Sequence, residues 1–286
     1  MLKYLIISIR PKQWYKNSLL FVCIVFSLNL FNASMWVDGI LAFIFFCMLS
    51  AGEYLINDVL DIERDKKHVI KCKRPIALGQ LKVSYALLFA ILLIVAALLG
   101  SYLKINTNFF IISASYVILT LLYSLLLKRF IIADVLLISV GFVVRAVAGC
   151  LAVSVFISPW LIVCTFLLAL LLALGKRRSE LVALGEQAEA HRPSLSRYST
   201  GMLDQLINIT TGAAIVSYLM YTFFVDNYYM MLTAPSVVYG LFRYLFLVHQ
   251  ENFGGEPERI FKDKATLINL AVWVLLVVIV LYKIPA

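Results

Sequence analysis

Three aspartates, Asp58, Asp61 and Asp65, follow one another at intervals of three and four residues directly after a long apolar stretch. No proline or glycine interrupts residues 53–73, so the sequence predicts a helix that continues through all three. At about 100° per residue they fall within an arc of roughly 60°, with Asn57 at its margin. Carboxylate and carboxamide oxygens are the hard ligands that Mg²⁺ takes when it also holds a phosphate group. The pattern predicts a Mg²⁺ site in which the three aspartates are metal ligands and catalytic residues.

The stretch that follows, residues 66–74, is rich in lysine and arginine. Such side chains suit an anion that lies over a bound metal ion. An alternative is an ordinary cytoplasmic loop whose positive charges fix the topology of a membrane protein. That alternative accounts for the basic residues but leaves the spacing of the aspartates unexplained, so we favour a site for a metal ion and a diphosphate.

The amino-acid composition indicates which class of protein carries this predicted site. Of the 286 residues, 63% are hydrophobic and 14% are charged. A soluble domain averages roughly half apolar and a quarter charged, so we expect an all-α integral membrane protein. The net charge of +9 is explained by the positive-inside rule and by phosphate ligands, and we expect no nucleic-acid partner. No stretch is polar enough for a separate soluble domain, so residues 1–286 are expected to form one membrane domain.

Nine apolar stretches have the length needed to cross a bilayer. They cover about residues 17–36, 39–57, 83–103, 107–127, 133–153, 159–175, 203–225, 230–248 and 266–284. Residues 1–16 precede them as a basic amphipathic lead-in that is expected to lie in the membrane interface. The sequence therefore predicts a bundle of nine transmembrane helices.

Lysine and arginine are concentrated at one set of helix ends. With an odd number of spans, this asymmetry places the N-terminus in the cytoplasm. The polar loops expected on the cytoplasmic side are 58–82, 128–133, 176–202 and 249–265. The connections on the opposite side are short, so any chemistry is expected at the cytoplasmic face.

Three more stretches on that face carry candidate residues, and each has a structural alternative. Residues 10–17 are basic and aromatic, which also suits an interfacial anchor. Tyr123, Lys128 and Asp134 also fit the capped start of a helix with topology charges. Residues 176–198 are long enough to cover a site, or they form a solvated connector.

Arg145 lies some eleven residues into the fifth expected span, roughly 16 Å deep at 1.5 Å per residue. A buried arginine in a bilayer costs several kcal/mol unless it is paired or hydrated. We expect a role in a phosphate-lined cavity, and the alternative is a structural pair with Glu53.

These residue types favour a reaction in which a diphosphate leaves. A metal ion and basic side chains stabilise the charge that builds on the departing oxygens while a carbocation-like centre forms. No Ser-His-Asp or Cys-His arrangement and no glycine-rich phosphate loop is evident in the sequence. The pattern therefore argues against acyl transfer and against nucleotide hydrolysis of the usual P-loop kind.

The chain resembles the UbiA superfamily of intramembrane prenyltransferases, in which an NDxxDxxxD motif ends the second of nine helices. Within it, the chain is most similar to the polyprenyl-phosphate phosphoribosyltransferase branch, which includes the decaprenyl-phosphate enzymes. Five motifs in the same order carry this resemblance: RPKQWYKN (10–17), NDVLDIERDKKHVIKCKRPIALG (57–79), YSLLLKRFIIAD (123–134), GFVVRAVAG (141–149) and KRRSEL (176–181). Ordinary UbiA prenyltransferases carry a second aspartate-rich motif after the sixth helix. This chain has KRRSE there, which argues against a prenyl diphosphate.

The resemblance implies Mg²⁺-dependent transfer of 5-phosphoribose from phosphoribosyl pyrophosphate (PRPP) to a polyprenyl phosphate of decaprenyl or undecaprenyl type. It implies a bacterial inner-membrane enzyme with a cytoplasmic active site, and cell-envelope biosynthesis is one possible use of its product. The implied substrate-binding residues are Asn57, Lys12, Lys16, Lys71, Arg74, Tyr123, Lys128, Asp134, Arg145, Lys176 and Arg177. The alternatives are a prenyltransferase acting on an aromatic or glycerol-type acceptor and a non-enzymatic transporter or binding protein for lipid phosphates. The sequence predicts no oligomeric state.

Overall fold

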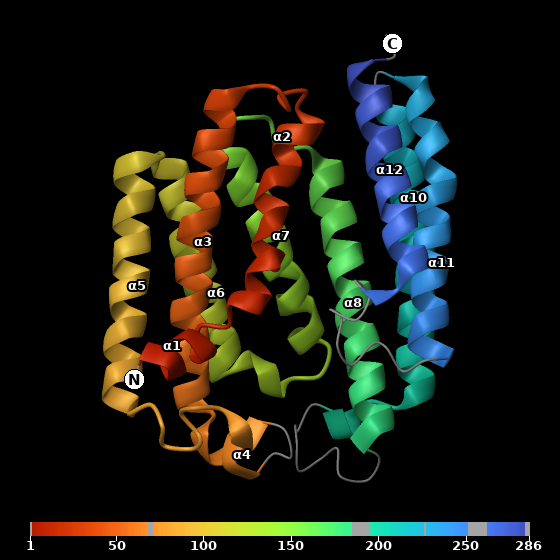
Figure 1. The fold of residues 1–286 in the computed structure, drawn as a ribbon. Helices are drawn as coiled ribbons and strands as arrows, with labels where there is room; N and C mark the ends of the chain where they lie inside the picture. The colour runs from red at the N-terminus through yellow and green to blue at the C-terminus, as the bar shows by residue number, and fades with distance from the viewer. Residues whose placement is uncertain (1, 68–70, 185–194, 226, 251–261, 284–286) are drawn as a thin grey trace. The chain divides into compact units, whose positions relative to one another are not determined.

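The computed structural model describes residues 2–67, 71–184, 195–225, 227–250 and 262–283 (Figure 1). Within these ranges the regular structure is helical and contains no β-strand, which confirms the predicted all-α class. The helices belong to two compact units, one of residues 1–128 and 141–157 and the other of residues 129–140 and 158–286. The single domain expected over residues 1–286 stays a prediction.

In the described part of the chain, eight helices are long and apolar enough to cross a membrane. The first unit contains α3 (Ala33–Leu60), α5 (Val83–Lys104) and α6 (Thr107–Leu125), while α7 (Ala133–Ala152) begins in the second unit and ends in the first. The second unit adds α8 (Pro159–Leu184), α10 (Thr200–Phe224), η6 (Tyr228–Thr233) with α11 (Ala234–Gln250), and α12 (Lys264–Tyr282). The shorter helices are α1 (Leu2–Ser8), η1 (Pro11–Phe21), α2 (Val22–Phe26), α4 (Ile62–Lys67), η2 (Lys71–Lys73), η3 (Leu127–Arg129) and η5 (Leu195–Arg197).

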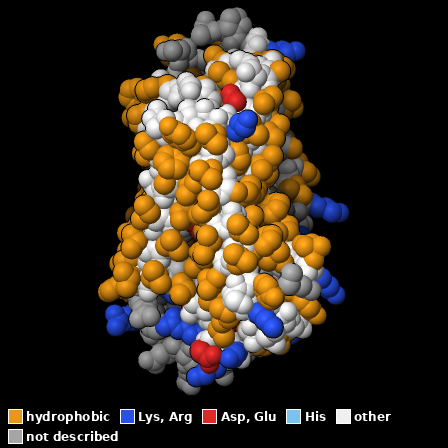
Figure 2. All heavy atoms as spheres, turned by 90° about the vertical axis from the view of Figure 1, so that its left-hand side faces the viewer, with side chains coloured by type: hydrophobic (Ala, Val, Ile, Leu, Met, Phe, Trp, Pro, Cys, Tyr) orange, Lys and Arg blue, Asp and Glu red, His pale blue; other side chains and the backbone are white. Residues whose placement is uncertain are grey.

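Helix α5 shows how these spans meet the membrane. Leu88, Ile91, Leu92 and Leu99 on this helix are more than half exposed. Figure 2 views the chain from the side of α5 and shows apolar side chains over most of this face, with several charged ones at the end where α4 lies and a few near the opposite end and along one edge. An apolar flank with charges at the end of the bundle is the surface that a lipid bilayer requires.

The first expected span, residues 17–36, is not one helix, so the prediction of nine spans is not confirmed. The chain instead forms the 11-residue 3₁₀ helix η1 and the five-residue α2, which run beside α3 (Figure 1). The side chain of Asn32 accepts hydrogen bonds from the backbone N–H groups of Ser34 and Met35, at 3.2 and 3.4 Å. This N-cap starts α3 at Ala33, before the boundary expected near residue 39. The cytoplasmic placement of the N-terminus stays a prediction.

A buried apolar cluster packs α1, α3, α5 and the loop after η2 together in the first unit. It joins Leu5 of α1, Leu55 of α3, Ile76 and Leu81 of the loop after η2, and Ala86 and Ala90 of α5. Helices α3 and α5 approach closely at Gly52, where an added Cβ would lie 3.0 Å from the carbonyl oxygen of Ala90. Small residues at such crossings are the usual means by which membrane helices pack. The cluster therefore holds α1 and the loop of residues 74–82 against the end of α3.

In the second unit, α8, α10 and α11 pack around a core that includes Leu171, Leu203, Ile207 and Tyr244. Arg243 lies within the span formed by η6 and α11, and its guanidinium donates to both carboxylate oxygens of Asp263, at 3.1 and 2.8 Å. These hydrogen bonds hold the pKa of Asp263 below its usual range. Asp263 also caps α12 by accepting from the backbone N–H of Thr266. Arg243 is thus compatible with a membrane helix because its charge is paired.

Candidate active site

The three aspartates predicted to act together lie at the end of α3 and in α4, but not on one continuous helix. Helix α3 ends at Leu60, and Asp61 follows with φ −101° and ψ 6°, outside the helical region. Helix α4 then begins at Ile62 and carries Asp65. The expected uninterrupted helix is therefore wrong at Asp61. The backbone N–H of Asp65 still bonds the carbonyl oxygen of Asp61, at 2.8 Å, so the hydrogen bonds between residues four apart continue past Asp61.

Arg74 joins two of the aspartates. Its Nη1 donates to Asp58 Oδ1 at 3.0 Å and to Asp65 Oδ2 at 2.6 Å. Both carboxylates are buried, so the guanidinium supplies the counter-charge that each of them needs away from water. The structure therefore places Arg74 beside Asp58 and Asp65, while its predicted contact with substrate stays a prediction.

Two more basic side chains complete what we call the carboxylate cluster, which consists of Asp58, Asp61, Asp65, Arg10, Arg74 and Lys128. Arg10 donates from Nη2 to Asp58 Oδ1, and its guanidinium lies 5.0 Å from the centre of the Tyr54 ring. Burial lowers the pKa of Arg10, and the charge of Asp58 opposes that shift. Lys128, in η3, donates from Nζ to both oxygens of Asp61, at 2.7 and 2.9 Å. In these contacts every carboxylate of the cluster faces a positive charge.

Local structure explains how Arg74 reaches the cluster. The backbone of residues 74–81 folds into turns in which Leu78 N–H bonds the carbonyl of Arg74 and Gln80 N–H bonds that of Pro75. Gly79 has φ +71°, the left-handed conformation that suits glycine. Ile76 and Leu81 anchor these turns in the apolar cluster described above. The PIALG segment of the sequence therefore positions Arg74.

Arg10 was absent from the residues predicted for the site, although it begins the N-terminal motif. It connects α1 to η1, and Pro11 occupies the first turn of η1. Its backbone has φ 51° and ψ 64°, a left-handed conformation that is uncommon for a residue with a side chain. The predicted residues of this segment, Lys12 and Lys16, lie in η1; Lys12 is exposed, and Lys16 lies over the ring of Tyr15.

A second polar cluster lies deeper in the first unit, around Arg145 of α7. Its Nε donates to Asn17 Oδ1 at 2.9 Å, its Nη1 to the carbonyl oxygen of Gly141 at 2.9 Å, and its Nη2 to the hydroxyl of Tyr116 at 2.5 Å. The expected alternative, a direct pair with Glu53, is replaced by contacts with neutral groups. Glu53 instead accepts a hydrogen bond from the Thr120 hydroxyl. Arg145 thereby connects α7 to η1 and α6.

In the second unit, Asp134 at the start of α7 is fully buried and accepts two hydrogen bonds. Arg177 donates from Nε to Oδ2 at 2.9 Å, and the hydroxyl of Tyr198 donates to Oδ1 at 3.0 Å. Arg177 also donates to Glu180 at 2.5 Å, and Tyr198 accepts from the backbone N–H of Ile132 at 2.7 Å. Burial, followed by the charge of Asp134, raises the pKa of Tyr198 to about 12. The sequence predicted Asp134 and Arg177 as site residues, and it indicated Tyr198 only as the end of the polar stretch 176–198.

Four predicted residues remain: Asn57, Lys71, Tyr123 and Lys176. Asn57 and Tyr123 are half-buried on α3 and α6, Lys71 is exposed in η2, and Lys176 is half-exposed on α8, 4.0 Å from Glu180. Residues 185–194 of the expected cytoplasmic loop 176–202 lie outside the described residues, as do residues 68–70 of the loop 58–82 and residues 251–261 of the loop 249–265.

Comparison with known proteins decides the family. Residues 18–262 match the UbiA prenyltransferase family. The chain belongs to the UbiA prenyltransferase family. The predicted resemblance is thereby confirmed, and the chain is an enzyme of the UbiA superfamily and an integral membrane protein.

UbiA relatives match the chain over nearly its whole length. It is 29% identical to the decaprenyl-phosphate phosphoribosyltransferase of Corynebacterium glutamicum, over 97% of this chain and 86% of that protein. It is 30% identical to the enzyme of the same name from Mycolicibacterium smegmatis, over 94% and 90%. Among solved structures, a UbiA homologue from Archaeoglobus fulgidus bound to GPP and Mg²⁺ superimposes with a TM-score of 0.74, at 18% identity, covering 97% of this chain and 99% of the other. The last comparison shows that the fold is that of UbiA proteins.

The residues of this UbiA chain suit a divalent cation by their chemistry. In the described ranges, no group of three or more His, Cys, Asp and Glu side chains is close enough to enclose a metal ion. Asp58 and Asp65 nevertheless direct one oxygen each at a single cationic nitrogen of Arg74. Mg²⁺ is usually held by one or two protein carboxylates together with water and substrate phosphate oxygens, and Asp58 and Asp65 are of this type. Asp61 pairs with Lys128 instead, so its role as a metal ligand stays a prediction.

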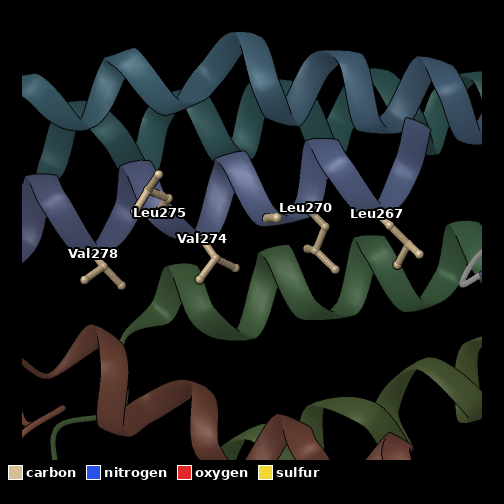
Figure 3. A pocket seen from close by; sticks show the side chains of 6 residues that line it. Leu267, Leu270, Val274, Leu275 and Val278 are labelled. Carbon is tan, nitrogen blue, oxygen red and sulfur yellow. The ribbon is translucent and has the colours of Figure 1, made fainter. Parts of the chain in front are cut away.

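An apolar hollow of about 540 Å³ lies along α12. None of the residues that line it belongs to the charged clusters described above. It is lined by Leu267, Leu270, Ala271, Val274, Leu275 and Val278, and in Figure 3 several of these side chains extend on the side that faces α8. The lining carries no polar side chain. It suits contact with lipid chains and offers nothing to a phosphate group.

Proposed function

We propose that this chain transfers 5-phosphoribose from PRPP to a polyprenyl phosphate, with release of pyrophosphate, at the cytoplasmic face of a bacterial inner membrane. The observation that carries the proposal is the similarity to two decaprenyl-phosphate phosphoribosyltransferases over more than nine-tenths of the chain. The carboxylate cluster supports it, because acidic and basic side chains alternate there as a metal diphosphate requires.

In this proposal Asp58, Asp61 and Asp65 hold Mg²⁺ at the end of α3. When bound, Mg²⁺ supplies positive charge that stabilises the leaving pyrophosphate. The bond between the anomeric carbon of the ribose and the pyrophosphate oxygen breaks, and a phosphate oxygen of the lipid forms the new bond to that carbon. The acceptor is already an anion at neutral pH, so positioning of the two substrates suffices without a general base.

The basic residues of the cluster are the proposed anion ligands. Arg74 and Lys128 would contact pyrophosphate or the 5-phosphate, with Lys71 on the same loop and Lys12 and Lys16 on η1. These side chains carry the fixed positive charge that a phosphate-transfer site needs. Asn57 and Tyr123 are proposed to line the same site from α3 and α6.

Either Arg145 of the first unit or Arg177 of the second is proposed to receive the acceptor phosphate, and Lys176 is a further candidate for substrate binding. Both arginines already bind protein groups: Arg145 bonds Asn17 and Tyr116, and Arg177 bonds Asp134 and Glu180. Each would therefore contact a phosphate only by exchanging or sharing one of these partners. Asp134 is then a residue that positions Arg177.

The KRRSE segment argues for a phosphoribosyl donor over a prenyl diphosphate. In the structure Arg177, Arg178 and Glu180 of this segment are engaged in ion pairs within the second unit. The segment therefore presents paired basic residues where a second cluster of aspartates would be needed for the prenyl-diphosphate reaction.

A donor comparison tests the proposal. The purified chain in lipid nanodiscs is incubated with Mg²⁺ and one of two substrate pairs. The first pair is ribose-labelled PRPP with polyprenyl phosphate, and the second is labelled geranyl diphosphate with an aromatic or glycerol-type acceptor. We expect label in the lipid fraction and pyrophosphate release with PRPP. Transfer from geranyl diphosphate to an aromatic or glycerol-type acceptor, with none from PRPP, would establish the prenyltransferase alternative. Consumption of neither donor, with retention of polyprenyl phosphate, would favour the binding or transport alternative.

A further inference from the structure

The contact between Arg74 and its two aspartates has the geometry of a cation site. One nitrogen of the guanidinium lies 3.0 Å from Asp58 Oδ1 and 2.6 Å from Asp65 Oδ2. The side chains of Asp58 and Asp65 are 2% and 4% exposed. Two buried carboxylates therefore aim at one point, and a positive charge that belongs to the protein already occupies that point.

The carboxylate cluster carries no excess of negative charge. Asp58, Asp61 and Asp65 bring three negative charges, and Arg10, Arg74 and Lys128 bring three positive charges within contact distance. The half-exposed Arg64 adds a further positive charge 3.9 Å from Asp61. A divalent cation that entered alone would add two uncompensated positive charges to a poorly solvated place. A divalent cation that entered together with a diphosphate would bring the negative charge that offsets them.

We propose that Arg74, assisted by Arg10, is a tethered counter-cation of the metal site, which a divalent cation must displace and which then binds the diphosphate of the donor. The inference rests on the proposed function, because it assigns two states to the same residues. In the first state the guanidiniums neutralise the aspartates. In the second state they contact the donor, so metal and donor bind cooperatively.

The structure places both arginines where such an exchange is feasible. Their side chains are 26% (Arg10) and 21% (Arg74) exposed, so each has a path to solvent. Arg74 projects from turns whose anchors, Ile76 and Leu81, are separate from its own side chain. Arg10 has a left-handed backbone, and its side chain rests on Asp58 and the ring of Tyr54. Local strain of this kind is commonly found at sites that change state.

The test measures metal binding without turnover. Mn²⁺, used as a paramagnetic substitute for Mg²⁺, is titrated into the full chain in nanodiscs, and free Mn²⁺ is read by electron paramagnetic resonance. Without a donor, Arg74→Gln is expected to bind Mn²⁺ about tenfold more tightly than wild type, because the competing charge is gone. With PRPP present, wild type is expected to gain Mn²⁺ affinity and Arg74→Gln to gain less. Lys82→Gln, which removes an exposed positive charge at the start of α5, is the matched control and should behave as wild type in both titrations.

Arg74→Gln removes a counter-charge from the buried carboxylates of Asp58 and Asp65, which could prevent the variant from folding. Two further variants therefore test the same proposal with smaller changes. Arg10→Gln removes one of the two cations on Asp58 and should show the same change with a smaller amplitude, while Arg74→Lys keeps the charge and should stay close to wild type. Mn²⁺ binding in the glutamine variants that is equal to or weaker than wild type, without a donor, would overturn the proposal. If geranyl diphosphate promotes Mn²⁺ binding where PRPP does not, the proposed function fails while the counter-cation role stands.

Discussion

Lys128 donates from its Nζ to both carboxylate oxygens of Asp61, at 2.7 and 2.9 Å, although 67 residues separate the two in sequence. The contact joins η3 to the bend that follows α3, and both side chains are largely buried. A doubly bonded carboxylate has a fixed orientation, which suits a group that must present an oxygen to a metal ion. This pair therefore joins the second and third of the five sequence motifs, residues 57–79 and 123–134.

Asp61→Asn tests the importance of that carboxylate. The amide keeps the shape of the side chain but removes the negative charge, so Lys128 loses its counter-charge and the proposed metal loses a ligand. We expect the rate of phosphoribosyl transfer to fall about 100-fold, as when a preorganised electrostatic group is removed. Glu63→Gln is the matched control, because Glu63 is exposed and pairs with Lys66. Equal losses in the two variants would contradict a specific role for Asp61.

Arg145→Lys tests whether Arg145 holds η1 in place. Lysine keeps the charge but cannot bond Asn17, Gly141 and Tyr116 together, so we expect a loss of roughly 2–4 kcal/mol in stability. Thermal unfolding in detergent measures it, with the exposed Arg197→Lys as the control. An unchanged unfolding temperature with a raised KM for polyprenyl phosphate would show that Arg145 contacts the substrate directly.

Gly149→Ala tests the crossing of α7 with the segment that precedes α2. A Cβ at Gly149 would collide with the backbone of Leu20, whereas Gly212 in α10 has open space around the same position. We expect Gly149→Ala to destabilise the chain by about 1–3 kcal/mol through overpacking. Gly212→Ala should be neutral or stabilising by up to about 1 kcal/mol, because alanine favours a helix. Equal unfolding temperatures for the two variants would show that α7 does not pack against Leu20.

Tyr198→Phe tests the hydroxyl that bonds Asp134. Because the pKa of Tyr198 is raised to about 12, above its usual value of about 10, its contribution to stability is complete below pH 10 and is lost as the pH rises toward 12. We expect the variant to be less stable at neutral pH by about 1–3 kcal/mol and to lack this alkaline component. Unfolding monitored by circular dichroism between pH 7 and 12 measures both, with the exposed Tyr228→Phe as control. A wild-type alkaline profile in Tyr198→Phe would contradict the assignment.

The acidic residues of the site could be predicted because their chemistry is local. Asp58, Asp61 and Asp65 are recognisable by type and spacing next to an apolar span, and Arg74 follows in the same loop. The helix that was expected to carry all three ends at Leu60, since Asp61 leaves the helical region without any proline or glycine to signal it. Tertiary contacts with Lys128 and Arg74 set the geometry there, and no local pattern encodes them.

Residues that reach the site from far along the chain were harder to predict. The N-terminal motif predicted Lys12 and Lys16 as site residues but not Arg10. Pro11, directly after Arg10, indicates that a turn separates Arg10 from η1. No sequence motif identifies Tyr198 as a partner of Asp134, because it is a single tyrosine at the end of a polar loop. The first span was misjudged because Asn32, an N-cap, lies inside an otherwise apolar stretch. A hydropathy profile alone does not detect the N-cap residue at which a helix begins.

The metal requirement of phosphoribosyl transfer is the most direct test of the account. Wild-type chain in nanodiscs, supplied with labelled PRPP and polyprenyl phosphate, is assayed with Mg²⁺, with EDTA, and with EDTA followed by excess Mg²⁺. We predict that formation of labelled lipid stops in EDTA and returns with Mg²⁺, while Asp61→Asn regains little under the same conditions. Undiminished formation of labelled lipid in EDTA would contradict it, because the carboxylate cluster would then act without a metal ion.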